Sequence, residues 1–99
     1  MKTQNIQVTD IVQATTTNAD AMPLYLLLKK EMTDDTCIVL SFRDSTPLSS
    51  SFLNTAIGNL VDDFGLDYVK THLKIVQCSK SVFDALKRYF DNLARVQDL

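Results

Sequence analysis

The fold of this chain is indicated by two neighbouring stretches of sequence, CIVLSF at residues 37–42 and SSSFLNTAIGNL at residues 49–60, with a short polar loop between them. The first stretch is a nearly continuous apolar run of strand length that is rich in β-branched residues. This pattern is typical of a central strand that is covered on both faces in a parallel sheet. The second stretch begins with three hydroxyl side chains, which predict the start of a helix.

The helix that begins at Ser50 is predicted to run to Phe64. Its apolar positions recur at helical spacing and are Phe52, Leu53, Ala56, Ile57, Leu60, Val61 and Phe64. The opposite face carries Asn54, Thr55, Asn59, Asp62 and Asp63. The pattern is that of an amphipathic helix, and we expect Ile57 and Leu60 to pack against the sheet. Gly65 is predicted to end the helix, because glycine readily adopts the left-handed conformation that follows many helix ends.

The segment before the first stretch predicts a strand and a helix. Residues 5–12 contain apolar and polar residues in alternation, which predicts a half-buried strand at the edge of the sheet. Asp20 is predicted to cap a helix that ends near Met32, with Pro23 in its first turn, where the missing N–H has no cost. This helix is apolar on most sides, so we expect it to lie between the sheet and a neighbouring helix.

The segment after the serine-rich helix predicts a third strand at residues 73–76 and a last helix that Ser79 caps. The element order is then β-α-β-α-β-α. Alternating units of this kind predict an α/β fold, with a mainly parallel sheet, right-handed crossovers and helices packed on the sheet.

The composition limits both the architecture and the class of partner. A chain of 99 residues with 45% hydrophobic content is sufficient for one domain, which we place at residues 1–99. The chain has no apolar run of membrane-spanning length and no basic-then-apolar N-terminus, so we expect a cytoplasmic protein that does not bind membranes. A net charge of −2 argues against nucleic-acid binding, which normally requires a basic face.

The cysteines and the histidine give no sign of a metal or redox site. Cys37 and Cys78 belong to no Cys-x-x-Cys or Cys/His cluster, so we expect reduced core thiols, no disulfide and no metal. Because Cys37 begins one predicted strand and Cys78 follows the end of another, parallel strands would hold them far apart. His72 is the only histidine, and we interpret it as structural. No cofactor is expected.

Polar residues gather at the carboxyl ends of the predicted strands, where open α/β sheets usually bind ligands. The residues expected at this edge are Arg43, Asp44, Ser45, Thr46, Ser49, Ser50, Ser51, Cys78 and Ser79. One serine is sufficient to cap the helix. Two further hydroxyls would lie at the positive end of the helix dipole, where an anion such as phosphate is favoured by roughly 0.3–1 kcal/mol. Two interpretations therefore remain, a cap with solvated neighbours or a site for an anion.

The chain does not fit the signatures of common enzyme classes. Cys37 and Arg43 have the Cys-x5-Arg spacing of cysteine phosphatases, but the residues between them lack glycine and are strongly strand-forming. Their N–H groups are expected in a sheet ladder and not around an anion. The chain also lacks a glycine-rich phosphate loop and a Gly-x-Ser-x-Gly elbow. We therefore expect a protein that is not an enzyme.

At Ser49–Leu53 the chain resembles the STAS fold of anti-sigma-factor antagonists, and more closely a STAS-like family of uncharacterised bacterial proteins. The resemblance covers Ile38 to about Arg95. In the antagonists a strand leads into Asp-Ser-Ser-Gly-Leu at a helix N-terminus, and the chain has Ser49-Ser50-Ser51-Phe52-Leu53 there. The STAS-like pattern continues through Gly58, Leu60 and Gly65.

The resemblance implies that Ser50 occupies the position that is phosphorylated in the antagonists. It also implies a partner that is a histidine-kinase-like ATPase or another regulator. The chain departs from the antagonists at two positions, since Ser49 replaces the Asp and Phe52 replaces the Gly. Phe52 fits the apolar stripe of the helix, which predicts a core position.

Three functional hypotheses follow. The first is a non-enzymatic regulatory module of the partner-switching type, which docks a protein through Arg43–Leu53 and is switched by phosphate on Ser50. The second is a domain that binds a small anionic ligand or nucleotide at the same helix start, with Ser50, Ser51 and Ser79 as donors. A small hydrolase ranks last. The identity of the partner and the oligomeric state are left open.

Overall fold

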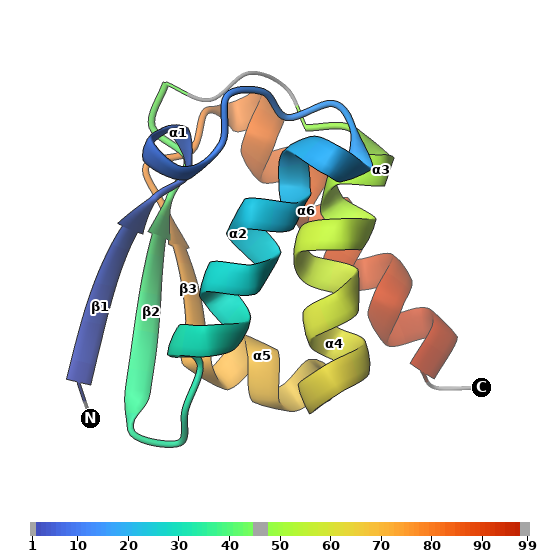
Figure 1. The fold of residues 1–99 in the computed structure, drawn as a ribbon. Coiled ribbons are helices and arrows are strands. Elements are labelled where there is room, and N and C mark those ends of the chain that lie inside the picture. Colours follow the sequence, from blue (N-terminus) through green and yellow to red (C-terminus); the bar gives the residue numbers. More distant parts are fainter. Residues whose placement is uncertain (1, 45–47, 98–99) are drawn as a thin grey trace.

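The computed structural model describes residues 2–44 and 48–97, with side chains as far as Arg95. The elements in chain order are β1 (Lys2–Gln7), α1 (Val8–Ile11), α2 (Asn18–Glu31), β2 (Thr36–Ser41), α3 (Ser50–Leu53), the π-helical turn η1 (Asn54–Gly58), α4 (Asn59–Phe64), α5 (Leu66–His72), β3 (Leu73–Val76) and α6 (Lys80–Gln97). The predicted α/β class, with a parallel sheet and helices packed on it, is confirmed (Figure 1).

The described strands form one parallel sheet in the order β1-β2-β3. The predicted central place of β2 and the edge place of the first strand are therefore correct. In the register, Ile6 lies beside Leu40, and Leu40 lies beside Ile75. Because the strands are parallel and nearly in register, all three end at the same edge of the sheet.

The helices lie on one side of this sheet in Figure 1, and burial along β2 alternates accordingly. Ile38 and Leu40 are fully buried under the helices, whereas Val39 between them is only half-buried. The prediction that this strand is covered on both faces was therefore wrong. The continuous apolar run did not distinguish the two cases, because Cys37 and Val39 are apolar although they lie on the face that the described helices do not cover.

The N-terminal prediction placed the first strand too late and continued it too far. Strand β1 ends at Gln7, and Val8 begins the short helix α1. Val8 and Val12 are both buried, and the Val12 N–H donates to the Val8 carbonyl at 3.0 Å. Their separation of four residues is the spacing of one helical turn, which the alternation at Ile6–Val8 concealed.

Helix α2 begins with a capping box instead of the predicted Asp20 cap. The N-cap is Thr17, whose hydroxyl accepts the Asp20 N–H at 3.1 Å, while the Asp20 carboxylate accepts the Thr17 N–H at 3.1 Å. Asp20 is thus the third helical residue, a reciprocal arrangement that satisfies two otherwise unpaired donors. Pro23 lies beyond the first turn in consequence. The helix packs on β2 and on the segment that contains η1 and α4, as expected.

The predicted helix from Ser50 to Phe64 exists as α3, η1 and α4 in direct succession. Its middle is a wide turn, in which the Asn59 N–H donates to the Asn54 carbonyl five residues earlier. Thr55 lies in this turn, three residues after the buried Phe52, and is itself buried, against the prediction of a polar face. Its hydroxyl donates to the Asn18 side chain at 3.1 Å. Ile57 and Leu60 are buried as predicted.

Gly65 ends this helix at a φ of 92°, in the positive region expected for glycine. The short helix α5 follows and was not predicted. Its residues Leu66 and Val69 are buried at a spacing of three, which is too short a pattern to identify from sequence. The helix returns the chain to the amino end of β3. Most of the larger fully buried side chains, including Phe52, lie in one core between the sheet and the helices.

Candidate functional site

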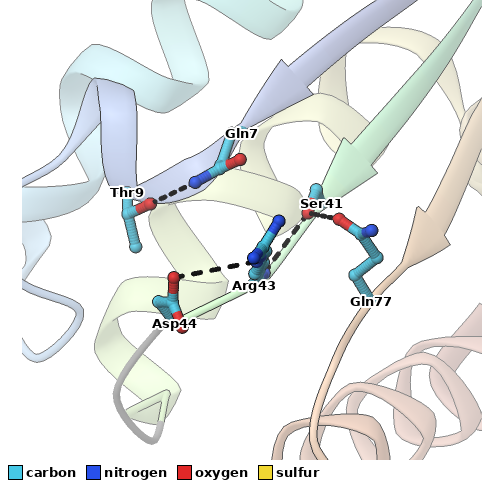
Figure 2. Close-up of polar contacts among 6 residues, drawn as sticks. All are labelled: Gln7, Thr9, Ser41, Arg43, Asp44 and Gln77. Carbon is cyan, nitrogen blue, oxygen red and sulfur yellow. Dashed lines mark hydrogen bonds and ion pairs between the residues drawn. The ribbon is translucent and has the colours of Figure 1, made fainter.

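The carboxyl ends of the strands carry polar residues in two separate groups of contacts (Figure 2). Ser41 ends β2, and its hydroxyl donates to Gln77 Oε1 at 2.8 Å. The backbone N–H of Arg43 donates to the same hydroxyl at 3.3 Å. At the end of β1, Gln7 Nε2 donates to Thr9 Oγ1 at 3.0 Å. These bonds hold the loops after the strands at one edge of the sheet.

The backbone at this edge contains two residues with unusual conformations. Asp44 has a φ of 62° and Gln77 a φ of 54°. Such values are uncommon for residues other than glycine and are often found at functional sites. Arg43 and Asp44 form an ion pair at 3.9 Å, but both side chains are exposed, so the pair contributes little to stability. They are available to a partner.

A shallow cavity of about 400 Å³ opens beside this edge, partly on the sheet face that the described helices leave uncovered. Its lining residues are Asn5, Ile6, Gln7, Asp10, Val39, Ser41, Val76 and Gln77. The sequence analysis missed Gln7, Asp10, Ser41 and Gln77 as members of this edge. The signal was present, since each of them lies at or just after the end of a strand.

The serine cluster consists of Ser49, Ser50 and Ser51, and these residues have different roles. Ser49 is the N-cap of α3, and its hydroxyl accepts the Phe52 N–H at 3.1 Å and donates to the Thr16 carbonyl at 2.7 Å. Its backbone N–H donates to the Thr15 carbonyl at 3.1 Å. Ser49 therefore both caps the helix and attaches it to the loop before α2. Ser50 and Ser51 are exposed.

Ser50 lies in a hollow of about 190 Å³ between the start of α3 and the middle of α6. The lining residues are Leu48, Ser50, Leu53, Ala85, Arg88, Tyr89 and Asn92. Arg88 is exposed and brings a cation to the hollow that contains the Ser50 hydroxyl. Burial, and to a smaller extent the Asp62 carboxylate, raises the pKa of Tyr89. Sequence analysis did not connect α6 with the serine cluster, because only tertiary packing brings them together.

Ser79 is not part of this hollow. Its hydroxyl accepts the Val82 N–H at 3.2 Å, which is the predicted capping of α6. Arg88 follows Ser79 by nine positions, so the two lie about 14 Å apart along the helix at 1.5 Å per residue. Ser79 is thus not among the residues that line the hollow beside Ser50, and a single anion site that contains both serines stays a prediction. Ser45 and Thr46 lie outside the described residues.

The histidine and the cysteines have structural surroundings. His72 is buried, with Nδ1 3.0 Å from the Thr36 carbonyl and its ring 4.2 Å from the Tyr68 ring. It lies at the amino end of the sheet, opposite the serine cluster. Cys37 and Cys78 are free, and both are half-buried instead of deep in the core.

The described part of the chain has neither a metal-binding group of side chains nor a membrane-spanning helix. Residues 2–44 and 48–97 contain no cluster of three or more His, Cys, Asp or Glu side chains that could hold a metal ion. No helix within these ranges is both long enough and apolar enough to cross a bilayer.

Comparison with known families gives a match to a STAS-like domain. The model of a STAS-like domain of unknown function (DUF4325) matches residues 20–83. The match begins earlier than the resemblance at Ile38 suggested, since it includes α2, and it ends near the start of α6. No curated protein and no solved structure gives a significant match to the chain. With more than half of its residues in this match, the chain belongs to the family of STAS-like domains of unknown function.

Proposed function

We propose that this protein is a non-enzymatic regulatory module of the cytoplasm that docks a protein partner through the start of α3, at Ser49–Leu53. The partner class that the STAS resemblance favours is a histidine-kinase-like ATPase or another regulator of the same type. Phosphate on Ser50 is the proposed switch. The family match supports a regulatory role of the kind that antagonist STAS domains have.

The observation that carries this proposal is the position of the Ser50 hydroxyl. Ser49 already caps the helix and is bonded on both sides, so Ser50 is not required for the fold. Its side chain is exposed in the first turn of the helix and lies in the hollow that contains Arg88. An accessible serine beside a cation and a helix N-terminus suits reversible modification.

A phosphate at Ser50 would change the charge of this surface by about −1.5 to −2. The helix N-terminus and the Arg88 guanidinium favour that charge within the protein. The same charge would oppose an acidic partner surface, or would have to lose its water on docking. Phosphorylation is thus expected to change docking while leaving the fold intact.

A non-enzymatic role is further supported by the use of the remaining candidate groups. The Ser49 and Ser79 hydroxyls cap helices. His72, which would be the obvious base for a nucleophilic serine, packs at the opposite end of the sheet against Thr36 and Tyr68. A hydrolase built on a serine and a histidine therefore has no support from the geometry.

The decisive experiment compares Ser50→Asp and Ser50→Ala in calorimetric titrations with a partner identified among the products of neighbouring genes. We expect Ser50→Asp to weaken binding more than Ser50→Ala does. Ser81→Asp is the matched control, because Ser81 is an exposed serine in the first turn of α6. Unchanged affinity for Ser50→Asp, with an unchanged melting curve, would leave capping by Ser49 as the only role of the cluster.

The alternative function is binding of a small anionic ligand or nucleotide at the same helix start, and the hollow lined by Ser50, Arg88 and Asn92 is the feature that supports it. A thermal-shift screen with nucleotides and inorganic phosphate tests it. Stabilisation that Arg88→Gln abolishes would favour this alternative over protein docking.

A further inference from the structure

Strand β3 has an open edge. Within the described residues it pairs only with β2. The Val76 carbonyl accepts the Phe42 N–H at 3.1 Å and so points toward β2. Peptide groups alternate in direction along a strand, so the backbone N–H and C=O groups of Lys74 also point toward β2. Those of Leu73 and Ile75 point outward. These outward groups are available to another strand.

An apolar groove lies beside this edge, between β3 and α6. Ile75, Phe83, Leu86 and Phe90 line it together with the stem of Lys87. Phe83 is 53% exposed, which is unusual for so large an apolar side chain. Alternate side chains of a strand added to β3 would enter this groove on the helix side of the sheet. The edge and the groove therefore form one surface that fits an extended peptide.

The charges around the groove indicate the chemistry of the peptide. A second hollow shares Ile75, Lys87 and Phe90 with the groove, and the charged residues that line it are Lys70, Lys87 and Asp91. Lys74 is exposed on the opposite face of β3, where it lies beside Val39. In a strand added to β3, the position directly opposite Lys74 thus favours a carboxylate. Opposite charges across a strand pair are stabilising, and like charges are destabilising.

The same reasoning argues against a second copy of the chain. A symmetric antiparallel pair of β3 strands forms most hydrogen bonds when Leu73 of each copy lies opposite Ile75 of the other. That register places Lys74 directly opposite Lys74 of the second copy, on a non-hydrogen-bonded pair where the side chains are closest. Repulsion between the two ammonium groups disfavours it.

We propose that the open edge of β3 binds an extended segment of a partner protein with the pattern apolar-acidic-apolar. The two apolar side chains enter the groove beside Phe83 and Phe90. The carboxylate lies opposite Lys74 on the other face. This surface is separate from the serine cluster, so it does not depend on the function proposed for Ser50.

The test begins with a phage-displayed library of random seven-residue peptides, selected against the full chain. We expect enrichment of the apolar-acidic-apolar pattern. The affinity of an enriched, synthesised peptide should fall at least about fivefold in Lys74→Glu, which replaces attraction by repulsion. It should recover when the acidic residue of the peptide is replaced by Lys. Lys30→Glu, an exposed position on α2, is the matched control and should bind as the natural chain does.

Backbone pairing is tested by methylating the peptide nitrogens one at a time. Strand addition predicts loss of binding at alternate residues, because only alternate N–H groups face β3. The proposal is wrong if no peptide is enriched, if Lys74→Glu binds as well as the natural chain with an unchanged melting curve, or if methylation has no alternating effect. It is also wrong if sedimentation shows a dimer that Phe83→Ser dissociates, since the occupant would then be a second copy.

Discussion

At the scale of single residues, Ser49 determines what its neighbours are able to do. Its hydroxyl satisfies the Phe52 N–H and binds the Thr16 carbonyl, so the helix start is capped and attached without help from Ser50. Phe52, which replaces the small residue of the antagonists, is fully buried and supports the core. Capping, packing and exposure are thus assigned to different members of one short motif.

Burial at single positions leads to a stability prediction for two leucines. Leu60 is completely buried in the core, whereas Leu26 on α2 is 55% exposed. Leu60→Ala should lower the free energy of unfolding by about 2–5 kcal/mol, because it leaves a cavity. Leu26→Ala makes the same chemical change at the surface and should cost less than about 1 kcal/mol. Urea unfolding of both variants checks this, and equal losses would mean that the wrong helix face has been assigned to the core.

At the scale of elements, the serine-containing helix is held in place by α2 on one side and α6 on the other. On the α2 side, Tyr25 donates to the Asp63 carboxylate at 2.5 Å and Lys29 lies 3.5 Å from it. On the α6 side, Tyr89 approaches Gly58 so closely that a Cβ at that position would lie 2.6 Å from the Tyr89 hydroxyl oxygen. Both contacts position the helix whose first turn carries Ser50.

The contact between Gly58 and Tyr89 of α6 predicts that Gly58→Ala has opposite effects on stability in the natural chain and in a Tyr89→Phe background. Alanine is favoured over glycine in a helix by about 1 kcal/mol, and Gly58 has helical angles. Gly58→Ala should nevertheless destabilise the protein, because the new methyl group forces Tyr89 to move. In a Tyr89→Phe background the obstructing oxygen is absent, so the same change should be stabilising. Melting temperatures of the four proteins check this, and an equal effect of Gly58→Ala in both backgrounds would contradict it.

The contact of Asp63 with Tyr25 and Lys29 of α2 predicts that the stability of the protein depends on pH. The hydrogen bond from Tyr25, followed by the charge of Lys29, lowers the pKa of Asp63 from its usual 3.8. The carboxylate therefore stabilises the folded state above the pKa of the unfolded chain. This stabilisation is lost as the pH falls through the lower, folded pKa.

The free energy of unfolding of the natural protein should thus decrease more steeply between about pH 5 and pH 2 than that of Asp63→Asn. Asp62→Asn removes the same charge from the adjacent position but keeps the bond to Tyr25, so it should retain the steeper decrease. Urea unfolding at several pH values measures the slopes. Identical slopes for the natural chain and Asp63→Asn would exclude this contribution.

At the scale of the whole molecule, the parallel sheet separates the functions in space. The carboxyl ends of the strands bring Gln7, Ser41 and Gln77 to one edge (Figure 2), while His72 lies at the other. The described helices cover one face of the sheet, and the edge of β3 is open. The proposed phosphoserine surface and the proposed peptide groove lie on different sides of α6, since Ser50 and Phe83 line different hollows.

The parallel arrangement also predicts the chemistry of the two thiols. Cys37 is the second residue of β2, and Cys78 lies beyond the end of β3. Val76, the last residue of β3, pairs with Ser41, so the strands alone separate the levels of the two thiols by roughly 13 Å. A disulfide requires Cα atoms about 4.4–6.8 Å apart. After mild oxidation, the mass of the monomer should therefore show no internal disulfide. Both thiols should remain reactive once the chain is unfolded. Detection of a Cys37–Cys78 bridge by mass spectrometry would contradict the topology.

Sequence alone determined the central strand to within one residue at each end, the third strand, a serine cap for each of two helices, and the amphipathic helix that buries Ile57 and Leu60. These features depend on local periodicity and on backbone groups a few residues away, which are visible in the chain itself. It also determined the fold family, because the serine-rich helix start carries a recognisable pattern.

Tertiary structure alone decided which face of the sheet is covered, that Thr55 in the wide turn is buried, and which residues lie near Ser50 and near β3. Arg88 lies far along the chain from Ser50, and Phe83 lies on a different element from Ile75. Their proximity results from how α6 packs against the sheet and against α3, and nothing in the local sequence specifies that packing. Local chemistry therefore determines the elements, whereas non-local packing of those elements determines the surfaces available for binding.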